Sequence, residues 1–484
     1  MPERQQRIKI PQSTFFAADY GLIYRASGIF YYKVTDTFRS TVSFLNYWKI
    51  RQDIDVGIIG SLRDMNGRLV NRQELSFDDC SVINFRPTPP QVPFEGSIEI
   101  EIFANQNLKV PFAALMGIYE APDSVSMVHS YARAYSNIEW EEGRTITSGR
   151  ESCWSVRDSD TVRSVAIMHN GAGTQPAQQA TLKVQRADEK DFMSATIDIP
   201  ELAPYASFKI YPSDFLPGLA EFLGPEHGNA QLSFELCRSF TRMLIGNERL
   251  DGSEFQITHS NFNYQAHESD HAEKEASAYM PFPNAGLSQR QVIVYPDIES
   301  GAYLLREANG AAHEFEGGTR LQLEAEPGNV EFTRKDGALP SRVPTGFAGQ
   351  GHPDQLAFEC SLGVLHNKRP SKRMWWGTVG PEADYTSKLI AVELRDVYGE
   401  MPKDVPITVK IYSSQKPDCL EAQLTCDDLE NLNVGIPILE LFPEAPKFLD
   451  GDFGYYSCSS DYGGLFLFSS LEHPNGCVSI EHGF

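Results

Sequence analysis

Three stretches of this chain end alike, in an alternating strand pattern that closes on a histidine followed closely by an aromatic residue. The closing segments are SVSMVHSY, FQITHSNF and VSIEHGF, and their histidines are His129, His259 and His482. Before each lies another apolar, strand-like segment and then a turn. A supersecondary unit that recurs along a chain constrains the fold more than any single motif does. The recurrence predicts three diverged copies of one unit.

The pattern inside the copies indicates strands rather than helices. In the segment SIEIEIF, strict alternation places Ile98, Ile100 and Ile102 on one side of a strand. Glu99 and Glu101 then point to the other side. The aromatic residues are mostly Phe and Tyr (29 and 20), which favour strands. We therefore expect an all-β, antiparallel protein with no long helix.

Further anchors recur in the same order between the closing segments. Apolar strands meet an asparagine at Asn46, Asn170 and Asn367, and GSLRDMNGRLV resembles VELRDVYGEMP. Gly67 in the first of these two segments and Gly399 in the second suit the positive φ of a tight turn. Two proline-containing segments, SDFLPGLAEFLG and LELFPEAPKFLDG, also match each other.

This order of strands, turns and closing strand resembles the immunoglobulin-like β-sandwich modules found in tandem in many bacterial proteins. The resemblance implies three tandem antiparallel Ig-like units at 1–137, 138–276 and 277–484. The third is enlarged at its start by extra strands such as QRQVIVYP and GTRLQLEAEP. A glycine-rich segment, PTGFAGQGHPDQ (344–355), is expected to be a flexible loop.

Charge and hydropathy exclude several classes of function. The formal net charge of −23 opposes binding to a phosphate backbone, so no nucleic-acid partner is expected. The sequence contains no run of about 18 apolar residues, so no membrane span is expected. The polar start MPERQQRIKIPQ predicts no signal peptide, hence a cytoplasmic protein, although an export route without a sequence signal stays open.

The densest basic and aromatic segment is HNKRPSKRMWW, and the first unit has NYWKIR at the corresponding place. Tryptophan faces stack on sugars or cations, and guanidinium groups hold carboxylates. These segments therefore suggest a site for an anionic glycan or an acidic protein surface. The alternative is that one tryptophan is core and the basic residues cover the acidic surface of a neighbouring unit. The candidate residues are Trp48, Lys49, Arg51, Lys368, Arg369, Arg373, Trp375 and Trp376.

The three closing histidines are a second candidate site, for a metal ion. If the units pack around a common axis, His129, His259 and His482 converge, and three imidazoles can hold one metal ion. The simpler interpretation is that each histidine bonds its own turn, so the sequence itself predicts no metal site. It also predicts no cofactor, because GFAGQG lacks the Lys-Ser/Thr of a phosphate-binding loop and no GxSxG elbow occurs.

Taken together, the pattern favours a non-enzymatic binding or assembly protein over an enzyme. Tandem sandwiches present loops and edge strands to partners, so we expect a protein or glycan partner, or self-association. The alternative function is a carbohydrate-active enzyme or accessory factor of surface-polysaccharide metabolism, with its site in a cleft between units. The arrangement of the units in space separates these hypotheses.

Overall fold

The chain folds into antiparallel β-sheets, which confirms the predicted all-β class. The computed structural model describes residues 24–108, 115–129, 145–186, 190–225, 227–237, 243–262, 276–296, 301–339, 343, 345–362, 373–381 and 384–483. None of the described helices is long and apolar enough to cross a membrane.

The described strands form four pairs of sheets, and every pair has the same topology. Counted within a unit, one sheet has the order first, sixth, third, fourth, and the other has the order fifth, second, seventh, eighth. A shared strand order through four units is an internal repeat at the level of the whole sandwich. The expected count of three units is therefore corrected to four.

The first two units hold the earlier strands. Unit 1 consists of β1 (Arg25–Val34), β2 (Arg39–Leu45), β3 (Gly57–Asp64), β4 (Leu69–Leu75), β5 (Val82–Phe85), β6 (Phe94–Phe103), β7 (Leu115–Ala121) and β8 (Ser124–His129). Unit 2 consists of β9 (Thr145–Val156), β10 (Val162–His169), β11 (Gln178–Arg186), β12 (Phe192–Ile199), β13 (Ser207–Ile210), β14 (Gly228–Cys237), β15 (Leu244–Arg249) and β16 (Phe255–His259), with β17 (Asn261–Phe262) added beside β9.

The region 277–484, expected as one enlarged unit, contains two complete ones. Unit 3 consists of β18 (Ser277–Phe282), β19 (Gln289–Val294), β20 (Ala302–Arg306), β21 (Ala312–Glu316), β22 (Leu321–Leu323), β23 (Gly328–Arg334), β24 (Thr345–Gln350) and β25 (Phe358–Ser361). Unit 4 consists of β26 (Met374–Val379), β27 (Thr386–Glu393), β28 (Ile407–Tyr412), β29 (Cys419–Leu424), β30 (Ile436–Pro437), β31 (Gly454–Ser460), β32 (Leu465–Glu472) and β33 (Val478–His482).

Short helices fill the connections between strands. They are α1 (Tyr47–Gln52), α3 (Pro212–Phe215), α4 (Leu219–Leu223), α5 (Arg395–Tyr398), the 3₁₀ turn η2 (Cys426–Asp428), α6 (Leu429–Val434), α7 (Ile438–Leu441) and α8 (Ala445–Leu449). The matched proline segments form the paired helices α3–α4 and α7–α8, each after the fifth strand of its unit. These two segments are therefore equivalent, as the sequence indicated.

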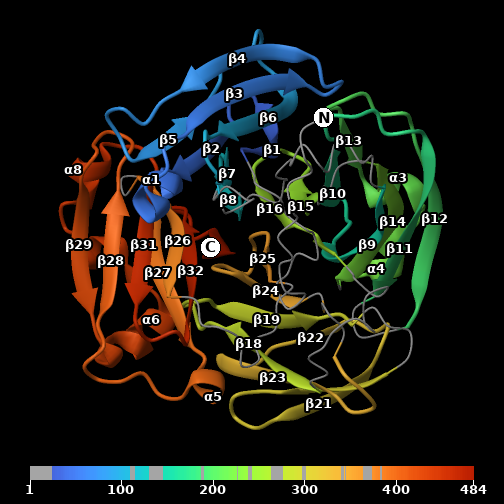
Figure 1. Ribbon diagram of the computed structural model, residues 1–484. Helices are drawn as coiled ribbons and strands as arrows, with labels where there is room; N and C mark the ends of the chain where they lie inside the picture. The colour runs from blue at the N-terminus through green and yellow to red at the C-terminus, as the bar shows by residue number, and fades with distance from the viewer. Residues whose placement is uncertain are drawn as a thin grey trace, which may run out of the picture.

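The four units close into a ring (Figure 1), with unit 1 in blue at the top and unit 4 in orange and red at the left. Contacts between the first and last units complete it. The Tyr455 hydroxyl donates to the Ser43 carbonyl at 2.8 Å, and the Tyr385 hydroxyl donates to a Glu120 carboxylate oxygen at 2.8 Å. Because residues so far apart in sequence meet, the arrangement is closed rather than a linear row.

One predicted equivalence is wrong: Leu62–Asp64 ends the third strand of unit 1, whereas Leu394–Asp396 follows the second strand of unit 4 and enters α5. The prediction of a flexible loop at 344–355 is wrong for Thr345–Gln350, which forms β24 and buries Phe347 in the core. Gly67 and Gly399 do adopt positive φ (80° and 79°), as predicted.

Candidate metal centre

The last strand of each unit lies toward the middle of the ring, and these strands pack on one another. β8 packs against β16 and β33, and β25 packs against the same two strands. Figure 1 shows β8, β16 and β25 around the centre. We call the region where these four strands meet the hub.

Serine side chains connect two of the hub strands where no backbone ladder joins them. The Ser124 hydroxyl accepts from the Phe255 N–H at 2.9 Å and donates to the Phe255 carbonyl at 3.3 Å. Ser126 makes the same pair of bonds with Ile257, at 2.8 and 3.2 Å. Each hydroxyl thus satisfies one donor and one acceptor of a neighbouring edge strand.

The closing histidines occupy one equivalent position in their units. Each lies opposite the seventh strand of its unit: His129 opposite Met116, His259 opposite Leu244 and His482 opposite Phe468. The residues after the last two donate an N–H there, Ser260 to Met243 and Gly483 to Leu467. In unit 3 Leu362 donates to Thr345 in the same way, so the equivalent position there is Ser361. Unit 3 therefore has a serine where units 1, 2 and 4 have histidine.

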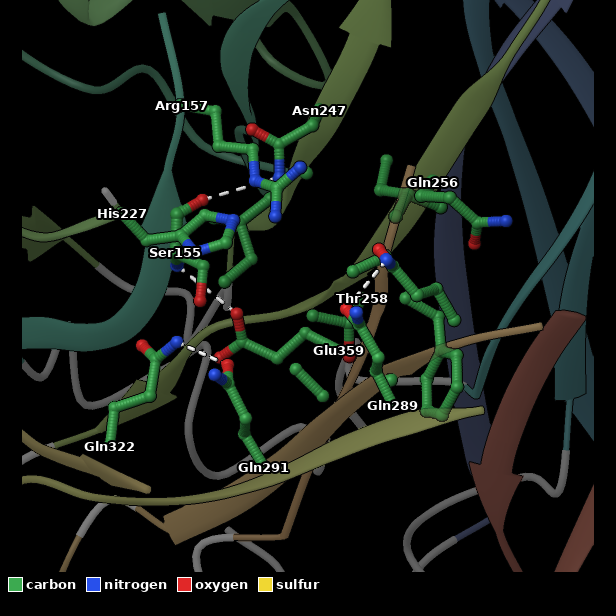
Figure 2. A pocket seen from close by; sticks show the side chains of 18 of the residues that line it. Ser155, Arg157, His227, Asn247, Gln256, Thr258, Gln289, Gln291, Gln322 and Glu359 are labelled. Atoms are coloured by element: carbon green, nitrogen blue, oxygen red, sulfur yellow. Dashed lines mark hydrogen bonds between the residues drawn. The ribbon is translucent and has the colours of Figure 1, made fainter. Parts of the chain in front are cut away.

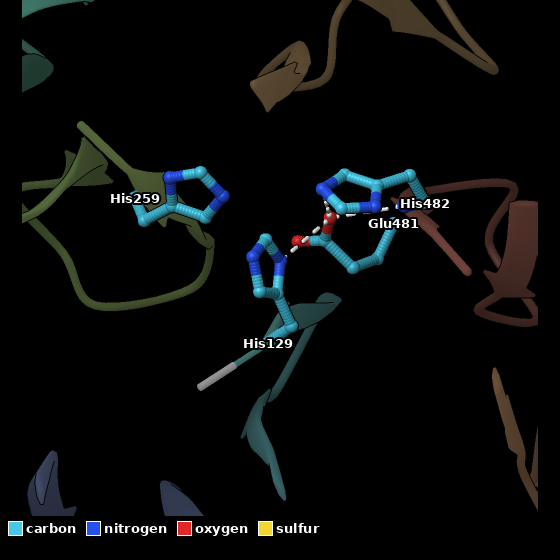
Figure 3. Close-up of side chains that lie close together, drawn as sticks. All are labelled: His129, His259, Glu481 and His482. Atoms are coloured by element: carbon cyan, nitrogen blue, oxygen red, sulfur yellow. Dashed lines mark hydrogen bonds and ion pairs between the residues drawn. The ribbon is translucent and has the colours of Figure 1, made fainter. Parts of the chain in front are cut away.

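The three histidines meet at the hub together with Glu481, the residue that precedes His482 (Figure 3). One candidate ligand atom from each of the four residues lies within 4.8 Å of the others. The imidazole centroid of His129 is 4.2 Å from that of His259 and 4.5 Å from that of His482. Three separate units thus bring imidazole nitrogens and one carboxylate to a single point.

Hydrogen bonds to the backbone orient two of the rings. Nδ1 of His259 lies 3.0 Å from the Ser260 carbonyl, and Nδ1 of His482 lies 3.0 Å from the Gly483 carbonyl. A neutral ring that donates its Nδ1–H to a carbonyl carries its lone pair on Nε2. This is the usual arrangement of a metal-binding histidine, whose second nitrogen is fixed by a backbone carbonyl.

The carboxylate is deeply buried beside the third ring. Glu481 is 1% exposed, and its Oε1 lies 3.1 Å from Nδ1 of His129. A buried carboxylate needs a compensating positive charge. A divalent cation among these groups would supply it, so the charges as well as the donor atoms suit a metal.

A cysteine also reaches the edge of the cluster. The Cys360 sulfur is 4.0 Å from Oε1 of Glu481. Burial raises the pKa of the Cys360 thiol well above its usual value, and the Glu481 charge adds to the effect. Cys360 is not among the four residues whose candidate ligand atoms lie within 4.8 Å of one another, so the donor set is three nitrogens and one oxygen.

That donor set selects a class of metal. Imidazole suits zinc, copper, iron and nickel, whereas magnesium and calcium prefer oxygen ligands alone. Four donors from the protein correspond to the tetrahedral coordination of a structural zinc site. The residues of the hub therefore fit a borderline transition-metal ion such as Zn²⁺.

The tryptophans expected at a ligand surface are instead buried. Trp48 is 1% exposed in the core of unit 1, and Trp375 and Trp376 are 5% and 4% exposed. Trp376 packs edge-on against Tyr47 across the junction of units 1 and 4, with centroids 5.2 Å apart. A core position was the alternative for one tryptophan, and the structure buries all three.

The basic candidates are not gathered around one ligand position. Lys49 pairs with Asp53 and Asp55 at 2.8 and 3.0 Å. Arg51 is exposed on α1, and Arg373 lies 3.6 Å from Asp461. The remaining candidates, Lys368 and Arg369, lie outside the described residues, as does Asn367.

Sequence patterns pointed to the histidines but not to Glu481. The strand alternation places neighbouring residues on opposite faces, so Glu481 and His482 would be expected to diverge. At the strand end both reach the hub. The only signal in the sequence was that an acidic residue precedes the last histidine, where the other copies have Val128 and Thr258.

Comparison with known proteins does not assign a family. No protein-family model matches the chain, and a search of curated proteins finds none with significant similarity. The function is therefore inferred from the geometry of the sites.

Proposed function

We propose that this protein binds one divalent transition-metal ion at the hub, through His129, His259, His482 and Glu481. The observation that carries the proposal is the convergence of these four donors, within 4.8 Å of one another, from the inner strands of units 1, 2 and 4. The proposal replaces the expectation of no metal, and it depends on the ring closure that the sequence left open.

The ion is proposed to be structural. Four protein donors complete a tetrahedral shell and leave no open position for a reacting ligand. His129 and His259 are 6% and 1% exposed, so exchange with solvent is restricted. An ion held by three units would join the ends of the ring, and its binding free energy would add to that of folding.

We propose a binding or assembly role for the ring as a whole. A metal-clasped ring would hold its four sandwiches in fixed positions, and their outer edges and junctions would present surfaces to partners. The alternative of carbohydrate chemistry is supported by a polar pocket at the junction of units 2 and 3.

Metal analysis of the purified full-length protein tests the proposal. We expect about one equivalent of zinc or a neighbouring transition metal per chain. The variants H259A and E481Q should lose most of it, because each removes a donor. H352A is the matched control, since the His352 side chain is 61% exposed and away from the hub. A wild-type protein without stoichiometric metal, even after incubation with Zn²⁺, would refute the site.

Thermal unfolding provides an independent readout of the structural role. Removing the ion with a chelator should destabilise the wild-type protein by about 4 kcal/mol relative to protein with metal at a thousandfold excess over Kd. The H352A control should respond like the wild type, whereas the metal-free H259A variant should not respond. Equal unfolding temperatures with and without metal would contradict a structural ion.

A further inference from the structure

A polar pocket lies at the junction of units 2 and 3, separate from the hub donors (Figure 2). Unit 2 contributes Ser155, Arg157 and His227 together with parts of β15 and β16, and unit 3 contributes parts of β19, β22, β24 and β25. The total space of about 690 Å³ includes open solvent at the mouth, and the cavity volume proper is about 90 Å³. The pocket is therefore an open cleft with little enclosed volume.

One wall of the pocket is rich in side-chain amides. Gln289 and Gln291 are two residues apart on β19 and therefore share a face of the sheet. The Gln350 amide donates to Gln289 Oε1 at 2.8 Å, and the Gln322 amide donates to Gln291. Because an amide both donates and accepts, this wall is suited to a ligand with many hydroxyl groups.

Some polar atoms in the lining are buried without a protein partner among the described residues. They include Thr258 Oγ1 from unit 2 and Glu359 Oε1 from unit 3. The second oxygen of Glu359 accepts from the Ser155 N–H at 3.1 Å. Buried polar groups are normally hydrogen-bonded, so these atoms mark positions at which a polar ligand would be bound.

Arg157 gives the pocket a positive charge, and no carboxylate forms an ion pair with its guanidinium within the part of the chain that the structure describes. Glu359 also lines the pocket, and burial raises the pKa of its carboxyl group, which favours the uncharged form. Burial and the charge of Arg249 lower the pKa of Arg157 to about 10, which still leaves it protonated at neutral pH. Arg249 itself pairs with Glu254 at 3.0 Å.

Arg320 and His227, which lie near Arg157, do not neutralise its positive charge. Arg320 donates to the Gly228 carbonyl and to the Ser155 hydroxyl, both at 2.6 Å. Burial, followed by the charges of Arg157 and Arg320, lowers the pKa of His227 to about 2, so this ring is neutral. Arg157 is thus positioned to bind an anionic group from the ligand.

We propose that the pocket binds a small polyhydroxylated anion, with Arg157 holding its anionic group and the glutamine wall holding its hydroxyls. A carboxylated sugar and a phosphorylated sugar share this chemistry, and a planar guanidinium binds either anion through paired hydrogen bonds. The site differs from the basic tryptophan segments expected from the sequence. It is also independent of the proposed metal.

Isothermal titration of the full-length protein tests the pocket with four probes. D-Glucuronate and D-glucose 6-phosphate represent the two anions, D-glucose lacks the charge, and acetate lacks the hydroxyls. We expect saturable binding of at least one hydroxylated anion, with D-glucose and acetate weaker by about tenfold or more. The stronger of the two anions identifies the source of the charge. Absence of saturable binding by both anions at about 10 mM overturns the proposal.

Two variants connect binding to the pocket. R157Q should weaken the anion by about tenfold or more and reduce its advantage over D-glucose, because it removes the charged contact. A348F, which fills the space beside Gln291 and Glu359, should abolish binding of all the probes. The matched control R68Q removes an exposed arginine in the turn between β3 and β4 and should bind like the wild type.

A correctly folded R157Q protein that binds the anions like the wild type overturns the role of Arg157. Folding is checked by its unfolding temperature. Measuring the titrations before and after chelation separates this proposal from the metal site. If metal is absent but the anion binds, only the metal proposal fails; if metal is present but neither anion binds, only the pocket proposal fails.

Discussion

At the scale of the residue, His169 combines complete burial with an ionisable ring. Its Nδ1 lies 2.7 Å from the Ser207 hydroxyl in the interior of unit 2. Burial lowers the pKa of His169 to about 3 from the usual 6.5. The unfolded chain therefore takes up a proton below pH 6.5 that the folded chain does not. This group contributes stability above pH 6.5, and the contribution is lost as the pH falls toward 3.

The variant H169Q tests that linkage. In metal-free protein, wild-type stability should fall by about 2 kcal/mol more than that of H169Q between pH 7 and pH 5. Denaturant unfolding at both pH values gives the two differences. H352Q, at an exposed histidine, should keep the wild-type slope. If H169Q and the wild type lose stability equally, the buried ring is not the cause.

Arg63 pairs with Glu99, a glutamate whose side of the strand was predicted from the sequence but whose burial was not. Glu99 and Glu101 lie on the face opposite the isoleucines, as expected, but they are 0% and 3% exposed. The Arg63 guanidinium lies 3.1 Å from Glu99 and covers it, together with the ring of Tyr205 from unit 2. The alternation fixed the face of each glutamate but could not indicate that a neighbouring unit covers that face.

Removing the guanidinium of Arg63 should therefore lower the free energy of unfolding. R63L leaves the buried Glu99 carboxylate without its nearest cation, and we expect a loss of about 3 kcal/mol or more in the free energy of unfolding. R68L, at an exposed position in the following turn, should change it by less than about 0.5 kcal/mol. A small effect of R63L, measured by urea unfolding, would show that Arg25 compensates for the lost charge.

At the scale of the element, the hub strands depend on serine hydroxyls rather than on a ladder. Ser124 and Ser126 lie two apart on β8 and therefore reach the same neighbouring strand. The double variant S124A/S126A leaves two N–H and two C=O groups of β16 without these partners. We expect a loss of about 2–4 kcal/mol in unfolding free energy.

The matched control for the serines is S194A, at an exposed position of β12. It should leave the unfolding free energy within about 0.5 kcal/mol of the wild type. Hydrogen exchange would locate the effect, because the amides of Phe255 and Ile257 should exchange faster in the double variant. Unchanged exchange at these amides would contradict the assigned role.

Strand alternation and the closing motif could be predicted at this scale, but the number of units could not. The repeat was recognised by its histidines, and unit 3 has Ser361 at that position. Its strands β21 and β22 are short and partly exposed, so their hydrophobic pattern is weak. The shared Leu-Arg-Asp sequence was also misleading, because Leu62–Asp64 ends a strand whereas Leu394–Asp396 follows a strand and enters the helix α5.

At the scale of the whole molecule, the ring closure determines the candidate sites. The hub needs donors from units 1, 2 and 4, and the pocket needs walls from units 2 and 3. Contacts between units follow from no local pattern, because they join residues that are hundreds of positions apart. The sequence could therefore name the histidines as candidates, whereas their convergence depended on a packing that only the structure gives.

Small-angle X-ray scattering tests the closed arrangement in solution. A compact chain of this length should have a radius of gyration of about 23 Å. Four sandwiches in a row would give a value well above about 30 Å. The H259A variant should remain near the compact value, because apolar contacts between units 1 and 4 do not depend on the metal. An extended wild-type particle would contradict the ring.

The contact between units 1 and 4 also bears on how the chain is made. Leu45, Met116 and Ile118 of the first unit share a hydrophobic cluster with Trp376, Tyr455 and Leu471 of the last. On the ribosome the first unit emerges long before its partner, so this apolar surface stays uncovered until synthesis is nearly complete. Truncated products that lack the last unit should therefore be preferred clients of chaperones, and full-length protein should be released from them only after the ring has closed.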